Sequence, residues 1–134
     1  MSSVFTQMLQ GKIPCHKIME DEKHLAFLEI RPLNPGHTLV IPKNETDYVF
    51  DLDDGALRDL FIFSKKVAHA IQKAIPCEKV AAIVYGLQVR HVHVHLVPVY
   101  GVIGELDFRN AKTADAADLQ SIAQRIGLTK PSIH

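Results

Sequence analysis

The stretch RHVHVHLVP, residues 90–98, decides both the fold and the chemistry of this chain. Three of the eight histidines in the sequence stand within it at two-residue spacing: His91, His93 and His95. Because successive side chains of a β-strand point to opposite faces, these histidines share one face, and Val92, Val94 and Leu96 share the other. The apolar face predicts packing against a core, and the histidine face predicts a polar surface that lines a cleft.

One interpretation of the histidine row is structural, with each imidazole buried and its hydrogen bonds satisfied. A second is a metal site, because two neutral imidazoles on one strand face can share a zinc ion. The outer pair, His91 and His95, fits a single ion poorly, since a rise of about 3.3 Å per residue separates their Cα atoms by about 13 Å. No acidic residue or cysteine stands close by in the sequence to complete a ligand shell.

A third interpretation is phosphate chemistry, because imidazoles spread along a strand match an extended substrate better than a point ion. The central imidazole is a nucleophile toward phosphorus if one ring nitrogen is bare and an acceptor holds the other. The flanking rings then contact phosphate oxygens or help to protonate a leaving group. Histidine suits these tasks because its pKa lies near physiological pH.

Hydrophobic periodicity predicts the remaining strands and helices around this stretch. The predicted strands are apolar or alternating runs at residues 13–20, 25–29, 37–42, 79–85 and 89–97. The predicted helices have apolar residues spaced three and four apart, at residues 3–10, 54–75 and 113–127. The order is therefore one helix, about three strands, a long helix, two strands and a terminal helix.

Several residues mark the predicted ends of these elements. Ser2 or Ser3 is expected to cap the first helix, and Gly11 to end it. Asp51, Asp53 and Asp54 favour the start of the long helix, which Pro76 stops. Further boundaries are Pro98 at the end of the histidine strand, a Thr113 cap and a stop at Gly127.

The chain has 134 residues, of which 47% are hydrophobic, so it predicts one domain over residues 1–134 with a real core. The strands lie close together in sequence, which favours an antiparallel meander. The predicted fold class is therefore α+β, with helices packed on an antiparallel sheet. The triad core is expected at about residues 3–100, followed by a C-terminal extension that carries the last helix.

Charge and composition exclude several classes of partner. Lys plus Arg and Asp plus Glu each number 15, and no basic run is present, so the sequence shows no nucleic-acid footprint. No apolar stretch is long enough to span a bilayer, and the N-terminus lacks a signal-peptide pattern. Cys15 and Cys77 have no metal-like spacing, and such thiols usually stay reduced inside cells. We therefore expect a cytoplasmic location.

Three motifs resemble the histidine triad (HIT) family. Residues 91–97 match its signature His-φ-His-φ-His-φ-φ, in which φ is apolar. Residues 36–43, GHTLVIPK, resemble its strand Gly/Thr-His-x-Leu-Val-Ile-Pro-Lys. The pattern over residues 4–32 is similar to the Hint-like branch. The motifs stand in order over about residues 3–100, so the resemblance is specific.

The resemblance implies a nucleotide hydrolase or transferase that acts at an α-phosphate, with purine nucleoside phosphoramidates as typical substrates. By match to the motif, His93 is the nucleophile and forms a transient nucleotidyl-histidine. His91 orients it through its backbone carbonyl, His95 lies near the phosphate, and His37 completes the cluster. This mechanism needs no metal and no other cofactor.

The resemblance also implies a nucleotide pocket. Glu29 stands where the family usually has an aspartate that binds ribose hydroxyls, although a solvated charge at a strand end is an equally plain interpretation. The positions of the apolar base pocket correspond to Val4, Phe5, Phe27, Leu28 and Ile30, several of which would be core residues in any fold. Gln88 and Val89 fall in the segment that contacts phosphate.

That segment departs from the family pattern, because the loop over residues 85–90 is shortened and lacks an asparagine. The departure leaves open a nucleotide-binding module with little catalysis, beside the enzyme and the metal protein. Hint-like proteins are similar in forming two-fold dimers through a helix and a strand. Together with the apolar helix at residues 54–75, this predicts a homodimer.

Overall fold

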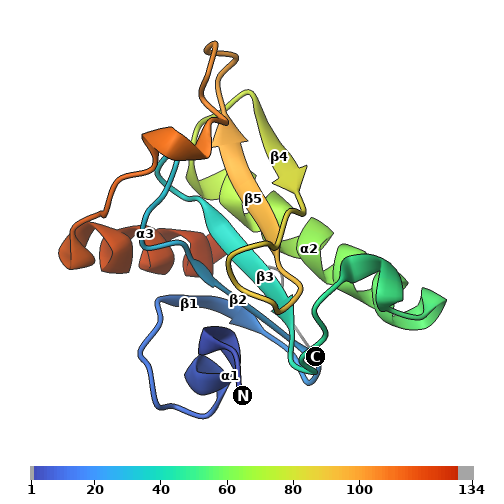
Figure 1. Cartoon of the computed structure of the whole chain (residues 1–134). Helices are drawn as coiled ribbons and strands as arrows, with labels where there is room; N and C mark the ends of the chain where they lie inside the picture. The colour runs from blue at the N-terminus through green and yellow to red at the C-terminus, as the bar shows by residue number, and fades with distance from the viewer. Residues whose placement is uncertain (1, 130–134) are drawn as a thin grey trace.

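The computed structural model describes residues 2–129, which form five strands and three α-helices (Figure 1). The strands are β1 Lys17–Glu20, β2 His24–Leu28, β3 Thr38–Pro42, β4 Lys79–Ile83 and β5 Val94–Val99. The helices are α1 Val4–Leu9, α2 Asp54–Ala74 and α3 Ala116–Thr129, with short 3₁₀ turns η1 Val49–Asp51 and η2 Phe108–Asn110. The predicted α+β class and order of elements are confirmed.

The sheet has the strand order β1-β2-β3-β5-β4, and every neighbouring pair is antiparallel. Strands β1 to β3 form a meander, and β5 then inserts between β3 and β4. The strand that begins at Val94 therefore lies inside the sheet, paired with β3 on one side and β4 on the other. Strand β4 is left at the edge of the sheet.

Each face of the sheet carries its own hydrophobic cluster. The larger cluster lies under α2 and α3 and includes Val92, Val94 and Leu96. The smaller cluster, between α1 and the other face, contains Phe5 and Phe27. Figure 1 shows α1 and α2 on opposite sides of the sheet. The predicted division of the histidine stretch into an apolar core face and a histidine face is confirmed.

The first two helices begin where the sequence predicts. Ser3 is the N-cap of α1, and its hydroxyl accepts a hydrogen bond from the Thr6 amide. Gly11 follows the helix with a φ of 76°, a left-handed conformation that glycine adopts without strain. Asp53 caps α2 by accepting from the Ala56 amide at 2.8 Å, and α2 ends at Ala74, before Pro76.

The predicted strand at residues 89–97 is wrong at both ends. It begins only at Val94, because the preceding residues bend and the Val92 amide donates to the Thr46 carbonyl at 2.7 Å. Pro98 does not end it but pairs with Val80 inside β5. Strand β3 begins at Thr38, which pairs with Leu96, so it does not extend to Pro98, and the Pro98 carbonyl accepts from Asn34 Nδ2 at 2.8 Å. The missing proline N–H therefore removes no ladder bond.

The last helix also differs from the prediction. Asp115, rather than Thr113, accepts from the amide of Ala117 at 2.7 Å at its start. Gly127 lies inside α3 and does not end it. A glycine inside a helix costs only about 1 kcal/mol, and the adjacent Ile126 is fully buried in the larger cluster, which favours continuation. Among residues 2–129, no helix has the length and apolar character needed to cross a bilayer; the cytoplasmic location stays a prediction.

Candidate active site

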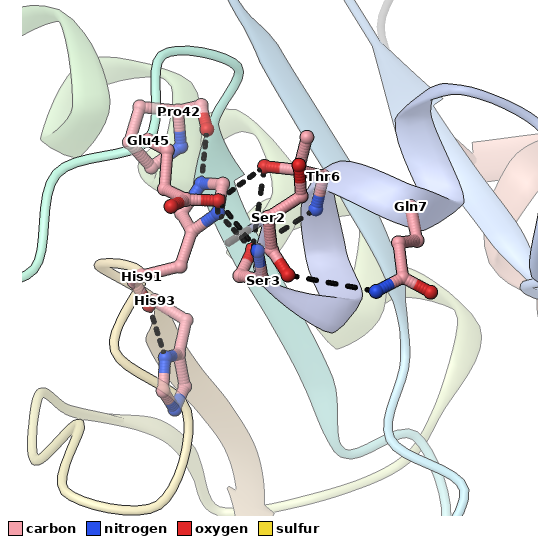
Figure 2. A network of polar contacts seen from close by, with 8 residues as sticks. All are labelled: Ser2, Ser3, Thr6, Gln7, Pro42, Glu45, His91 and His93. Atoms are coloured by element: carbon pink, nitrogen blue, oxygen red, sulfur yellow. Dashed lines mark hydrogen bonds and ion pairs between the residues drawn. The ribbon is translucent and has the colours of Figure 1, made fainter.

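The central histidine of the row has one nitrogen anchored and one nitrogen bare. His93 Nδ1 lies 2.7 Å from the carbonyl oxygen of His91 (Figure 2). Because a carbonyl only accepts, Nδ1 carries the proton, and Nε2 of the neutral ring keeps its lone pair. Burial lowers the pKa of His93, which favours the neutral ring. This is the protonation state that nucleophilic attack on phosphorus requires.

His91 is fixed through both ring nitrogens. Its Nε2 donates to the Pro42 carbonyl at 2.8 Å, and its Nδ1 lies 2.7 Å from the Ser3 hydroxyl. The side chain is fully buried. If His91 and His93 bound one metal ion, the His91 ring would lose one of these two hydrogen bonds, although the ring is fully buried. The geometry instead fits the predicted orienting role, in which His91 acts through its carbonyl.

His37 and His95 form a second fixed pair. The Leu33 amide donates to His37 Nδ1 at 3.0 Å, so His37 Nε2 carries the proton and donates to His95 Nδ1 at 2.9 Å. His95 Nε2–H is then a free donor. Burial lowers the pKa of His37 to about 4. Burial and the neighbouring His37 and His93 lower the pKa of His95 to about 3, so both rings are neutral near pH 7.

Glu29 follows β2 and lies beside this pair. One potential ligand atom from each of Glu29, His37 and His95 falls within 4.8 Å of the others. Burial raises the pKa of the Glu29 carboxyl, which accepts from the Arg31 amide at 3.2 Å. A metal-bound histidine usually donates its second ring N–H to an acceptor, but His37 Nδ1 faces the N–H of Leu33. This donor set therefore does not fit a metal on His37 Nε2.

Aromatic side chains close the histidine face more than the alternation predicts. The Phe5 ring lies 5.1 Å from His93, and the Phe108 ring lies 4.9 Å from His95, both edge to face. His93 and His95 keep only 6% and 7% of their surface exposed. Access to these rings is therefore confined to a small edge. Phe108 stands in a segment without periodicity, so no sequence signal indicates its place.

The structure brings together some residues predicted to bind the nucleotide, at the base pocket or in the phosphate segment, and separates others. Phe5, Phe27, Val4 and Val89 gather in the smaller cluster. The other positions behave as follows: Leu28 lies in the larger cluster, Ile30 is 54% exposed, and Gln88 is exposed on the loop before His91. Leu28 packs on the opposite face of the sheet from Phe27, because neighbours in a strand point to opposite faces, and its place in a base pocket stays a prediction.

Fold and site together define a class of protein. An antiparallel sheet carries a row of alternating histidines, and the middle imidazole keeps a bare nitrogen beside an anchored one. The HIT domain model matches residues 10–102, and the chain belongs to the HIT family.

The similarities to individual proteins agree with this assignment. The chain is 33% identical to Protein hit of Bacillus subtilis over 131 residues. This alignment covers 92% of the chain and 90% of Protein hit. It is 37% identical over 100 residues to adenosine 5'-monophosphoramidase hnt1 of Schizosaccharomyces pombe, covering 73% and 74%. A solved Hit-like protein of Bartonella henselae superposes with a TM-score of 0.85, 27% identity and 96% coverage of each chain. Family membership supports a nucleotide-processing hydrolase or transferase.

Proposed function

We propose that this protein cleaves purine nucleotide conjugates, phosphoramidates above all, at the α-phosphate through a covalent nucleotidyl-His93. The observation that carries the proposal is the 2.7 Å hydrogen bond from His93 Nδ1 to the His91 carbonyl, which leaves Nε2 bare. The similarity to an adenosine 5'-monophosphoramidase supports the same substrate class.

The reaction takes two steps at the same phosphorus atom. His93 Nε2 first forms a bond to phosphorus, and the leaving amine departs with the electrons of the broken bond and takes up a proton from water. The imidazole becomes cationic, and the His91 carbonyl at 2.7 Å stabilises it. Water then attacks phosphorus, breaks the bond to Nε2 and releases the proton, so the enzyme is regenerated. The Nε2–H of His95 donates to a phosphate oxygen.

The nucleoside is assigned to residues around this centre. Glu29 can accept hydrogen bonds from two ribose hydroxyls, and its carboxyl lies next to the His37–His95 pair. The apolar side chains of Phe5, Phe27 and Val89 offer a wall for the purine. Gln88 is exposed on the loop before His91 and supplies an amide donor for phosphate.

Trapping the intermediate tests the proposal. Wild-type protein mixed with an adenosine phosphoramidate and quenched in acid-free conditions should gain the mass of one adenylyl group. His93→Ala should gain none. His69→Ala is the matched control, because His69 is an exposed histidine on α2, and it should label like the wild type. Labelling of the His93→Ala variant would refute a nucleophilic His93.

A nucleotide-binding module with little catalysis is the second candidate, favoured by the shortened loop at residues 85–90. Calorimetry with adenosine monophosphate, combined with turnover assays, separates the two functions. Tight binding without cleavage of any phosphoramidate would select the module.

We also propose a two-fold homodimer through β4 and α2. A groove of about 520 Å³ lies between α2, η1 and the chain just after β4, and its lining is apolar except for one acid and one base: Val49, Phe50, Asp54, Leu57, Arg58, Phe61 and Val84. Phe50 and Phe61 are 72% and 42% exposed. Light scattering at micromolar concentration should give a dimer mass, and Phe61→Asp should give a monomer. A monomeric wild type would contradict the proposal.

A further inference from the structure

We propose that Ser3 is a positioning residue for the nucleophile, acting through His91. The proposal rests on the proposed function of His93 and adds a residue to it that is remote in the sequence. Ser3 and His91 stand 88 positions apart, and their side chains meet at 2.7 Å (Figure 2).

The direction of this hydrogen bond follows from its neighbours. His91 Nε2 must carry the ring proton, because its partner is the Pro42 carbonyl at 2.8 Å. When the ring carries that one proton, Nδ1 is a lone pair that needs a donor, and Glu45 Oε1, 3.9 Å away, can only accept. The Ser3 hydroxyl accepts from the Thr6 amide at 3.0 Å, which leaves its own proton for His91. The alternative acceptor, Thr6 Oγ1, is farther away at 3.3 Å.

Burial makes this donor necessary. His91 has no exposed surface while Ser3 is in place, so in the native structure the serine hydroxyl, and not solvent, meets its Nδ1. A buried acceptor that loses its donor keeps the full penalty of desolvation. The His91 ring would then turn away from its unpaired position, and this shift moves the residue whose carbonyl holds His93 Nδ1–H.

A carboxylate fixes Ser3 in turn. Glu45 Oε1 accepts from the Ser3 amide and from the Thr6 hydroxyl, each at 2.7 Å. These hydrogen bonds lower the pKa of Glu45 to about 2, so its charge persists at neutral pH. Figure 2 shows the chain of contacts running from Glu45 through the start of α1 to His91 and on to His93.

The network is not that of a hydrolase with a serine nucleophile. In such an enzyme the acid binds the histidine nitrogen opposite the serine. Here the Pro42 carbonyl occupies that nitrogen, and Glu45 binds the amide of Ser3 and the hydroxyl of Thr6 instead. Ser3 is therefore held as a donor, and it orients the ring rather than attacking a substrate.

The hydrogen bond between Ser3 and His91 also positions the helix that carries Phe5. Ser3 is the N-cap of α1, and Phe5 in its first turn packs 5.6 Å from His91 and 5.1 Å from His93. The hydroxyl thus ties the helix that carries Phe5 to the segment before β5 that carries the nucleophile. A single residue sets both relative to each other.

Three substitutions separate the positioning role from helix capping. Ser3→Ala removes both, Ser3→Thr keeps both, and Ser3→Asp keeps the capping acceptor but offers no proton to His91 Nδ1. Ser2→Ala is the control, because only the main-chain carbonyl of Ser2 enters the network. The measurements are kcat and KM on an adenosine phosphoramidate, and ¹⁵N NMR of the imidazole nitrogens without substrate.

We expect Ser3→Ala and Ser3→Asp to lower kcat roughly 10- to 100-fold with little change in KM, as for a displaced reacting group. In the wild type we expect ¹⁵N signals of an unprotonated Nδ1 on His91 and a protonated Nδ1 on His93. In Ser3→Ala and Ser3→Asp both signals should move away from these positions. Ser3→Thr should restore both readouts. If Ser3→Ala does not fold, the comparison of Ser3→Asp with Ser3→Thr still decides the question.

The proposal is overturned if Ser3→Asp matches Ser3→Thr in kcat and in imidazole signals, because Ser3 would then be a helix cap alone. Unchanged imidazole signals in every Ser3 variant overturn it equally. Since these signals are read without substrate, a wild type without turnover would refute the proposed function, and the positioning role would still be decided by NMR.

Discussion

The side chains from His91 to Leu96 lie on two faces of the chain. Both faces are buried, but packing holds one and hydrogen bonds hold the other. On the apolar face, Val92, Val94 and Leu96 are 2%, 0% and 2% exposed. On the histidine face the values are 0%, 6% and 7%. Burial does not distinguish the faces. The apolar side chains are held by non-directional packing under α2, and the imidazoles by hydrogen bonds that fix which nitrogen carries a proton.

This difference teaches where stability and chemistry separate. Packing tolerates small rotations, because dispersion and hydrophobic contacts have little angular preference. Each anchored nitrogen of these imidazoles needs a partner of the right kind, a donor for a lone pair or an acceptor for an N–H. The partners of His91, His93 and His95 come from four separate segments, at Ser3, His37, Pro42 and the His91 carbonyl. A change on one face should therefore affect activity, and a change on the other should affect stability.

The largest expected effect is that of His93→Ala on turnover. Loss of the nucleophile should reduce kcat on an adenosine phosphoramidate by at least about 10³-fold. The circular dichroism spectrum should match the wild type, because the neighbouring Val94 keeps its place in the core. Turnover within tenfold of the wild type would contradict the assignment of the chemistry to the histidine face.

Leu96→Ala tests the opposite face with a neighbouring residue. Leu96 is 2% exposed in the larger cluster, so its truncation should lower the free energy of unfolding by about 2–5 kcal/mol. Urea denaturation measures this loss. Turnover per folded molecule should stay within a few-fold of the wild type, and a loss as large as that of His93→Ala would show that the faces are not separable.

Acidification should weaken the histidine face. The pKa values of His37 and His95 are lowered to about 4 and about 3, while the unfolded chain has ordinary values near 6.5. The unfolded state binds more protons between these limits, so stability falls as pH decreases from about 6.5 to about 4. A shift of the size at His37 corresponds to roughly 3 kcal/mol.

Urea denaturation at a series of pH values measures this slope. The double variant His37→Gln/His95→Gln should show a shallower fall, because amides do not take up protons in this range. An equal slope in the double variant would assign the pH dependence to other groups. Glu29, whose pKa is raised, titrates with the opposite sign and is present in both proteins.

The smallest effect is expected far from both faces. Asp53→Ala removes the N-cap of α2 and should cost about 1 kcal/mol of unfolding free energy, without a change in kcat. Asp59→Ala, at an exposed position within the same helix, is the control and should stay within about 0.5 kcal/mol of the wild type. An equal loss of unfolding free energy in the two variants would show that Asp53 does not stabilise α2 as its N-cap.

Local sequence determined the features that depend on near neighbours. The alternation of residues 91–96 assigned both faces, because side-chain direction in an extended chain repeats every two residues. A cap at Ser2 or Ser3 and a cluster of aspartates at the start of the long helix are predicted from local sequence, and the structure selects Ser3 and Asp53 as the caps. The motif match over residues 91–97 also identified the family that the HIT domain model confirms.

Only the tertiary structure decided which distant groups meet. Ser3 was visible as a cap but not as the donor to His91, because a hydrogen bond across 88 positions leaves no local pattern. Phe108 contacts His95 from a segment without periodicity, and Pro98 could stay in β5 because β3 does not extend to its level. Sequence periodicity fixes the direction of a side chain, whereas the protonated nitrogen of each histidine depends on partners that folding alone brings into contact.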